Sequence, residues 1–263
     1  INLDNPHLYY VNFADIRWQE TSVEAVYRPN YYCFEAGIGD IDQKLQNILR
    51  KILSRVHGQT DFERESAVHD MLASNILYDD TDLKTSLGQS VMNHTILGVF
   101  FGKKAVCEGI AKAVKFLLNL LDIHCIVAVG QGMDNESSQE IAHAWNIVQL
   151  GGRWYHLDVT WDVNLSIEKQ IAHDYMNITD AEALREHSWI ERFPSCNSIE
   201  MNYYFHNGLT VMNINDAKVL LQRSIGAQSR FLEMKYCQSK QGSCEMLFSQ
   251  IKMFADAMLP YTS

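Results

Sequence analysis

The glycine pair Gly151–Gly152 separates two largely apolar stretches, residues 142–150 and 153–161, and restricts the fold more than any other feature. Two consecutive glycines suit the two-residue turn of a β-hairpin, because both central residues of that turn need a positive φ. The sequence therefore predicts two antiparallel strands in which residue i pairs with residue 303 − i. A longer turn or a bulge would break this register.

In this register His143 is opposite Thr160, and Asp158 is opposite Trp145. Side chains two positions apart on a strand share a face, so His143 and Asp158 are diagonal neighbours on one face, roughly 7–8 Å apart. We expect a hydrogen bond in which the carboxylate orients the imidazole and favours its charged form. Asp162 is a weaker alternative to Asp158 as the acidic partner.

Cys107 precedes a run of apolar residues at helical spacing, which predicts a helix from about Cys107 to Leu121 with the cysteine in its first turn. The apolar positions are Ile110, Ala111, Val114, Leu117, Leu118 and Leu121. The positive end of a helix favours a thiolate, and the thiolate is the nucleophilic form of cysteine. On this segment alone, a buried structural cysteine is the more common interpretation.

Other elements follow from periodicity and capping signals. Thr60 with Glu63, and Asp40 with Gln43, predict the starts of two amphipathic helices. The expected strands are His7–Val11, Val23–Tyr27, 123–130, 142–150, 153–161 and Arg230–Cys237; an acidic loop is expected at 131–140, and helices around Ala181–His187, at Asp216–Arg223 and at the C-terminal end.

The chain has 263 residues, which is enough to bury a substantial core without disulfides or metal. We divide it into N-terminal strands (1–35), a core that contains Cys107, His143 and Asp158 (36–206) and a helix-strand-helix extension (207–263). The six cysteines form no CxxC pair, so neither a disulfide scaffold nor a zinc site is expected, and no cofactor is predicted.

The formal charge of −10 disfavours nucleic acid as a partner, because nucleic-acid binding needs a basic face. The most apolar run, Phe116–Val129, is interrupted by Asn119, Asp122 and His124, so no integral membrane segment is expected. The chain begins at Ile1 rather than Met, and a signal or anchor removed upstream would fit an extracytoplasmic protein. The sequence leaves the oligomeric state open.

Three motifs carry a family resemblance: VCEGIAKAVKFLLNLLDIHCIVAVGQG from Val106, HAWNIVQLGGRWYHLDVTWD from His143, and VHDMLASNILYDD from Val68. Together with residues 173–189 and 193–208 they resemble the bacterial transglutaminase-like superfamily of papain-type cysteine enzymes. The likeness covers about residues 60–210. It implies an α+β fold in which the cysteine helix packs on an antiparallel sheet that carries the histidine and the aspartate.

By this resemblance Cys107 is the nucleophile, His143 the general base and acid, and Asp158 the orienting residue. The implied chemistry is acyl transfer at protein or peptide amides through a thioester, with hydrolysis by a protease or amidase expected ahead of transamidation. His69 and Asp70 would support the site by packing and hydrogen bonding. The alternative is a transglutaminase-like module that binds a partner without catalysis.

The backbone N–H of Cys107 would supply one donor to an oxyanion hole. A second donor is not identified by the sequence. The candidates are Asn93, His94, Trp145 and Trp161, each more typical of a structural role.

Overall fold

The computed structural model describes residues 3–20, 25–31, 37–79, 91–133, 139–167, 170–229, 231–237 and 244–258, with backbone only at 13–20, 25–30, 244–247 and 256–258. The chain forms two compact units, Ile1–Ser198 and Ile199–Ser263. The sequence placed the corresponding boundary later, between residues 206 and 207. Each unit is described by itself.

The centre of the first unit is a five-stranded antiparallel sheet in the order β8-β7-β6-β5-β9. Its strands are β5 (Cys125–Met133), β6 (Glu140–Leu150), β7 (Arg153–Leu157), β8 (Met176–Ile178) and β9 (His187–Ser188). Gly151 and Gly152 both have positive φ, 57° and 78°, and β6 pairs with β7 from Asn146–Leu157 to Leu150–Arg153. The predicted hairpin turn is therefore confirmed, and so is the register between Asn146–Leu150 and Arg153–Leu157.

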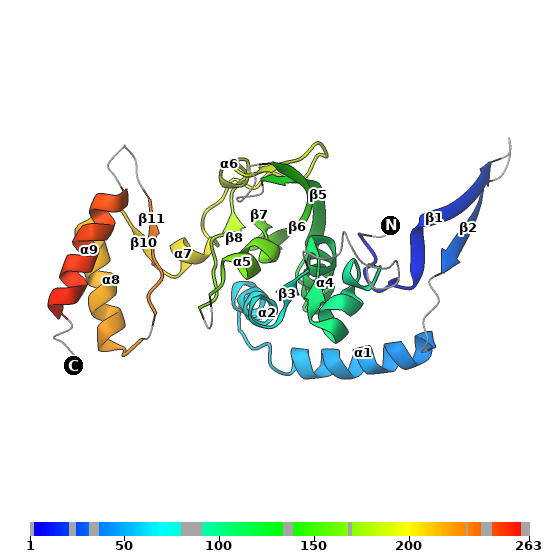
Figure 1. Ribbon diagram of the computed structural model, residues 1–263, viewed down its shortest axis with the longest axis horizontal. Coiled ribbons are helices and arrows are strands. Elements are labelled where there is room, and N and C mark those ends of the chain that lie inside the picture. The colour runs from blue at the N-terminus through cyan, green and yellow to red at the C-terminus, as the bar shows by residue number, and fades with distance from the viewer. Residues whose placement is uncertain are drawn as a thin grey trace. The chain divides into compact units, whose positions relative to one another are not determined.

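Helix α4 (Cys107–Leu120) packs against β5 and β6 (Figure 1), and its start and end agree with the sequence prediction. Val114, Leu117 and Leu118 are fully buried on its inner side. Each such side chain contributes about 1.5–3 kcal/mol through removal from water. This packing places the first residue of α4 over the sheet.

The predicted strand 153–161 is wrong beyond Leu157, because Asp158 ends β7 and begins a helix. The Asp158 carboxylate accepts a hydrogen bond from the backbone N–H of Trp161 and so caps α5 (Val159–Leu165). The ladder pairs predicted for His143 with Thr160 and for Trp145 with Asp158 do not form. Side-chain capping at Asp158 outweighs the apolar alternation that follows it.

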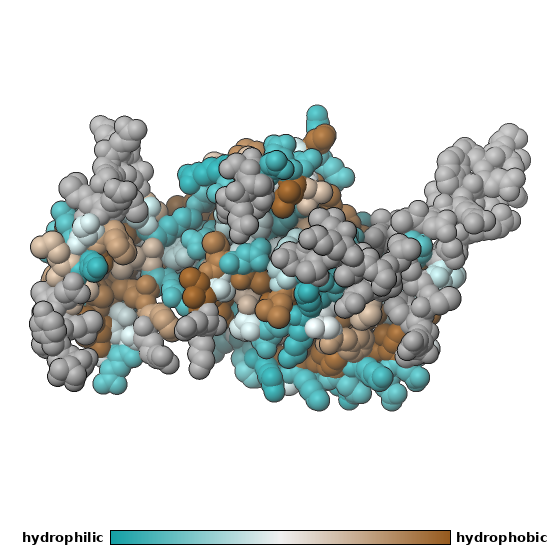
Figure 2. Space-filling view, viewed as in Figure 1, coloured by the Kyte–Doolittle hydropathy of each residue, from teal (hydrophilic) through white to brown (hydrophobic). Residues whose placement is uncertain are grey.

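Other helices of this unit are α1 (Ile38–Leu53), α2 (Asp61–Asn75), the π-helical η2 (Gly98–Gly102) and α6 (Asp180–Ala183). The capping box of Thr60 and Glu63 is present at α2 as predicted. The predicted cap by Asp40 is wrong, because α1 begins at Ile38 after Gly37 and has no side-chain cap. In Figure 2 hydrophilic residues follow the outer edge of α1 and hydrophobic residues lie above it, as in an amphipathic helix.

Short strands complete the unit. β1 (Val11–Glu20) pairs antiparallel with β2 (Ala25–Tyr31), and β3 (Leu77–Tyr78) pairs parallel with β4 (Lys104–Ala105). Residues 7–10 form turns rather than the predicted strand, with the N–H of Leu8 bonded to Asn5 and that of Val11 to Leu8. The predicted loop at 131–140 is shorter, because β5 continues to Met133 and β6 starts at Glu140; residues 134–138 lie outside the described part.

The second unit contains α7 (Tyr203–His206), β10 (Thr210–Val211), α8 (Ile214–Gly226), β11 (Lys235–Tyr236) and α9 (Cys244–Met258). Val211, Ala217 and Leu220 form its small core. The predicted strand Arg230–Cys237 is reduced to the two residues of β11, which pair parallel with β10. Among the described residues, no helix combines the length and apolarity that crossing a bilayer requires.

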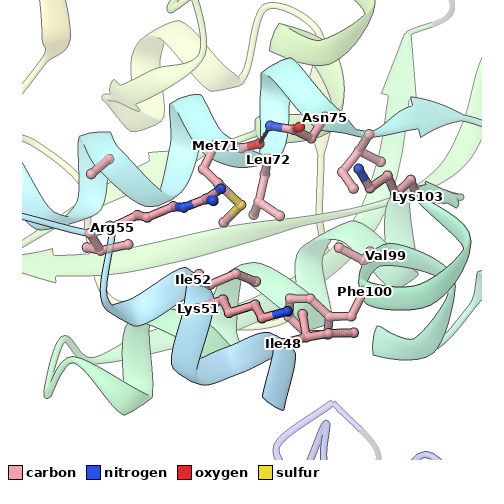
Figure 3. Close-up of a pocket in the computed structure, with 13 residues that line it drawn as sticks. Ile48, Lys51, Ile52, Arg55, Met71, Leu72, Asn75, Val99, Phe100 and Lys103 are labelled. Atoms are coloured by element: carbon pink, nitrogen blue, oxygen red, sulfur yellow. Dashed lines mark hydrogen bonds between the residues drawn. The ribbon is translucent and has the colours of Figure 1, made fainter. Parts of the chain in front are cut away.

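A cavity of about 460 Å³ lies between α1, α2 and η2 in the first unit (Figure 3). Its wall is mostly apolar, with Ile52, Leu72 and Phe100 among the lining residues. Cys107, His143 and Asp158 do not line it. The residues that the sequence predicts for the chemistry therefore lie elsewhere, where α4 contacts β6.

Candidate active site

Cys107 is the first residue of α4 and is partly exposed. Its side chain packs with Leu3 against Ala111 of its own helix and Val127 and Ala144 of the sheet. The preceding residue, Val106, is extended and provides no side-chain cap, so the helix end keeps its partial positive charge near the thiol.

His143 lies on β6 and connects the thiol to the carboxylate. Its Nε2 is 2.6 Å from Oδ2 of Asp158, and its ring also forms a hydrogen bond with the Cys107 thiol. Because Nε2 is used by Asp158, Nδ1 is the nitrogen that faces sulfur. The structure thus brings all three residues predicted from the sequence into one hydrogen-bonded chain.

The electrostatics favour an ion pair of thiolate and imidazolium. Burial alone would raise the pKa of Cys107, but the His143 ring and the backbone N–H of Ala144 outweigh it and lower that pKa. Burial alone would lower the pKa of His143, but Asp158 and the thiol outweigh it and raise that pKa to about 10. Burial opposes ionisation of Asp158, yet hydrogen bonds from two histidines hold its pKa well below the ordinary value.

Two tryptophans fix the plane of the imidazole. The His143 ring stacks on Trp161 at 5.2 Å between centroids and on Trp145 at 5.9 Å. Gly132 on β5 makes room for this stack, since a Cβ there would lie 2.8 Å from Trp161 and 3.2 Å from His143.

The other residues singled out from the sequence form the framework around the site. Asp162, the alternative to Asp158, accepts from His69 at 3.0 Å, and Asp70 bonds to both His69 and His173 at 2.9 Å. Burial raises the pKa of Asp162 to about 6, while Asp162 and Asp70 raise that of His69 to about 9 against the opposing effect of burial. This network ties α2 to α5, so Asp162 is not the partner of His143.

Three of the four proposed oxyanion donors have other partners. The Asn93 amide donates to Asp79, and Trp145 Nε1 donates to His156 Nδ1 at 2.9 Å. Nδ1 of His94 lies 2.7 Å from Glu108, the neighbour of Cys107. The two side-chain N–H groups of Asn93 and Trp145 therefore hold the framework together, which agrees with the structural role that the sequence favours for them.

His187 is the site residue that sequence reasoning missed. It lies on β9, and its Nε2 is 3.0 Å from the same Asp158 oxygen that holds His143. A strand of two residues has no periodicity, and the sequence predicts helix around Ala181–His187, whereas α6 ends at Ala183 and His187 lies on β9. The only signal was the likeness of residues 173–189 to the family.

Within the described ranges, three clusters have the composition that metal ions use: His69 with Asp70 and His173, His143 with Asp158 and His187, and His156 with Asp180 and Cys196. In each cluster, histidine and aspartate already hydrogen-bond to one another. These bonds account for the clustering without an ion.

Parts of the chain are similar to known proteins. Kyphoscoliosis peptidase of Homo sapiens is 29% identical over 127 residues, which are 46% of this chain and 18% of that protein. The Mus musculus protein is 28% identical over the same length. The chain thus spans under a fifth of the curated relatives that it matches.

A solved structure described as a crystal structure of a TGase has 13% identity and a TM-score of 0.39, covering 65% of this chain and 50% of that one. A family model described as the transglutaminase-like superfamily matches residues 47–159, a range that includes Cys107, His143 and Asp158. This part of the chain is therefore similar to the transglutaminase-like superfamily, and in it helix α4 packs on an antiparallel sheet.

Proposed function

We propose that the protein is a cysteine-dependent enzyme that transfers acyl groups from protein or peptide amides, with Cys107 as nucleophile, His143 as acid and base, and Asp158 as the orienting residue. The observation that carries the proposal is the hydrogen-bonded chain from the Cys107 thiol through His143 to Asp158. Hydrolysis is the proposed main reaction, and transamidation is its variant when an amine replaces water.

In the first half-reaction the Cys107 thiolate attacks the amide carbonyl carbon and forms a tetrahedral intermediate. The His143 imidazolium gives its proton to the leaving amine as the carbon–nitrogen bond breaks, which leaves a thioester. In the second, neutral His143 takes a proton from water, and the resulting hydroxide attacks the thioester. The acid is released and the thiolate–imidazolium pair is restored. Asp158 keeps the same tautomer of His143 throughout.

The name of the curated relatives, kyphoscoliosis peptidase, supports hydrolysis of a peptide bond as the first activity to test. The alternative is a module of this superfamily that binds a partner without catalysis. A bacterial, extracytoplasmic origin, expected from the sequence, stays a prediction.

The reactivity of the six cysteines decides between enzyme and binding module. We expect iodoacetamide at pH 6 to alkylate Cys107 faster than the other cysteines, because a thiolate reacts where a thiol does not. Peptide mass spectrometry gives the rate at each position. His143→Ala should slow the alkylation of Cys107 and leave the rates of the other cysteines unchanged. Slow, uniform labelling of all cysteines in the native protein would refute the proposal that the protein is an enzyme.

Activity is then tested with a library of peptide amides, comparing the native chain with Cys107→Ala. Release of free amine that Cys107→Ala abolishes identifies hydrolysis. Incorporation of a labelled primary amine instead identifies transamidation. Turnover that survives in Cys107→Ala would exclude the proposed nucleophile.

A further inference from the structure

The Asp158 carboxylate has three hydrogen-bond donors, and two of them share one oxygen. His143 Nε2 and His187 Nε2 approach Oδ2 at 2.6 Å and 3.0 Å, while the N–H of Trp161 reaches Oδ1 at 3.2 Å. Asp158 is 2% exposed and His187 4% exposed, so water does not substitute for these donors. An ionised carboxylate only accepts, which places a proton on Nε2 of His187.

His187 is held in this position by a dedicated strand. β9 pairs with β5 through His187–Gly132 and Ser188–Gln131. Gly130 permits the approach, since a Cβ there would lie 2.1 Å from the carbonyl oxygen of Ser188. The His187 ring lies between two indoles, at 4.1 Å from Trp161 and 4.9 Å from Trp145. Its Nδ1 is buried without a hydrogen-bond partner among the described residues.

We propose that His187 is a positioning residue of the active site: it fixes the Asp158 carboxylate toward His143 and, by sharing Oδ2, limits how strongly Asp158 raises the basicity of His143. The inference rests on the proposed function of Cys107, His143 and Asp158. A second donor to the same oxygen takes up part of its negative charge, so less remains to stabilise the imidazolium.

The other titratable groups around this pair belong to the surrounding elements and do not contact Oδ2 of Asp158 in the described structure. They are Cys107 on α4, His156 on β7 with Asp180 on α6, and Tyr175 before β8 with its hydrogen-bond partner Glu186. His187 is therefore the group whose removal changes the charge on that oxygen most directly.

The test is the pH dependence of Cys107 alkylation by iodoacetamide, measured by mass spectrometry in variants of the full chain. An ion pair gives two steps in rate: thiol ionisation at low pH and loss of the imidazolium proton at high pH. In His187→Leu we expect the upper step to move up by ~0.5 pH unit, because Asp158 then acts on His143 alone. His187→Gln, which returns an N–H donor near the Nε2 position, should restore the native profile.

His173→Leu is the matched control, since His173 is also buried and bonded to an aspartate, Asp70. It should lower the melting temperature without moving the upper step. If His187→Leu does not fold, His187→Asn replaces it, because the shorter amide does not reach Oδ2 and should shift the step as well.

If a folded His187→Leu or His187→Asn variant shows the upper step in alkylation rate at the same pH as the native protein, the inference is overturned. The proposed function is then left intact. A native protein that shows no low-pH thiolate step refutes the proposed function itself. The two failures are therefore distinguishable within one experiment.

Discussion

The carbonyl oxygen of Asn93 lies where a side chain at position 109 would begin, 2.2 Å from the Cβ that Gly109 lacks. The same carbonyl accepts the N–H of Val106, the residue before Cys107. The absence of a side chain at Gly109 thus lets the segment before η2 hold the start of α4.

Gly109→Ala should therefore destabilise the fold even though alanine favours helices. The new methyl group displaces Asn93 and breaks its bond to Val106, with an expected loss of about 2–4 kcal/mol in the free energy of unfolding. Gly39→Ala in α1 is the control, because nothing lies within 4 Å of its Cβ. Urea denaturation measures both, and equal stabilities would contradict the close approach.

Asp158→Asn separates the two roles of the aspartate. The amide oxygen can still cap α5 at Trp161, but its NH₂ group toward His143 favours the tautomer whose proton sits on Nδ1, opposite the thiol. Alkylation of Cys107 at pH 6 should fall at least ~10-fold, since a neutral ring no longer stabilises the thiolate.

Asp158→Ala is the comparison, because it also loses the cap and should cost about 1 kcal/mol more in stability than Asp158→Asn. Thermal unfolding gives the stability of each variant. Native alkylation rates in Asp158→Asn would show that the charge of Asp158 does not act on the thiol through His143.

The hairpin and α4 were predictable because their signals are local. Gly151–Gly152 sets the turn, and the turn sets the register, so Asn146 opposite Leu157 follows from residues within one segment. The helix from Cys107 follows likewise from its own apolar spacing. That these two elements pack together, and so bring Cys107 to His143 and Asp158, was implied by the family resemblance and not by either segment alone.

The elements that were missed depend on contacts between distant segments. The apolar neighbours of Asp158 predict a strand at this position, but its carboxylate caps α5. Asp162 forms a hydrogen bond with His69, which lies far earlier in the chain, and therefore does not contact His143. His187 reaches Asp158 only because β9 pairs with Gly132 of β5. No periodicity within two residues reveals such a strand.

We expect the stability of the protein to depend on pH through Glu65 on α2. It is fully buried, and its Oε2 accepts from the Asn177 amide at 2.7 Å. Burial raises its pKa from 4.5 to about 8, although Asn177 and His69 oppose the rise. Its Oε1 and the Asn177 Oδ1 are both buried and have no hydrogen-bond partner in the described part of the chain, an arrangement that a protonated acid facing an amide would satisfy.

Because the folded-state pKa exceeds the unfolded value, the unfolded chain loses this proton first as the pH rises. The contribution of Glu65 to the free energy of unfolding is greatest below about pH 4.5, declines between pH 4.5 and about 8, and stays low at higher pH. Glu65→Gln should remove the decline and gain about 2–4 kcal/mol at pH 9 relative to the native chain. Urea titrations at pH 5 and 9 measure it.

The control for Glu65 is Glu140→Gln, which changes an exposed carboxylate on β6 and should leave the pH dependence as it is. The amide introduced by Glu65→Gln can accept from Asn177 Nδ2 and donate to Asn177 Oδ1, as a protonated acid would, so the stability of this variant at pH 5 should be close to native. Equal pH dependence of Glu65→Gln and the native chain would show that Glu65 is not protonated in the fold.

Gly132→Ala tests whether the imidazole stack matters for reactivity as well as for packing. Its Cβ would lie 2.8 Å from Trp161 and 3.2 Å from His143, so one of the two rings must move. A shifted imidazole loses its alignment with the Cys107 thiol and with Asp158. We expect alkylation of Cys107 at pH 6 to slow ~10-fold or more, because small displacements of a catalytic group cost one to two orders of magnitude.

Gly102→Ala is the matched variant, since its Cβ would meet nothing within 4 Å. Melting temperatures show how much of the effect is lost stability, and the alkylation rate of the folded fraction shows how much is lost alignment. A Gly132→Ala protein that folds and reacts like the native chain would mean that the stack of His143 on Trp161 does not set the geometry of the thiol and imidazole.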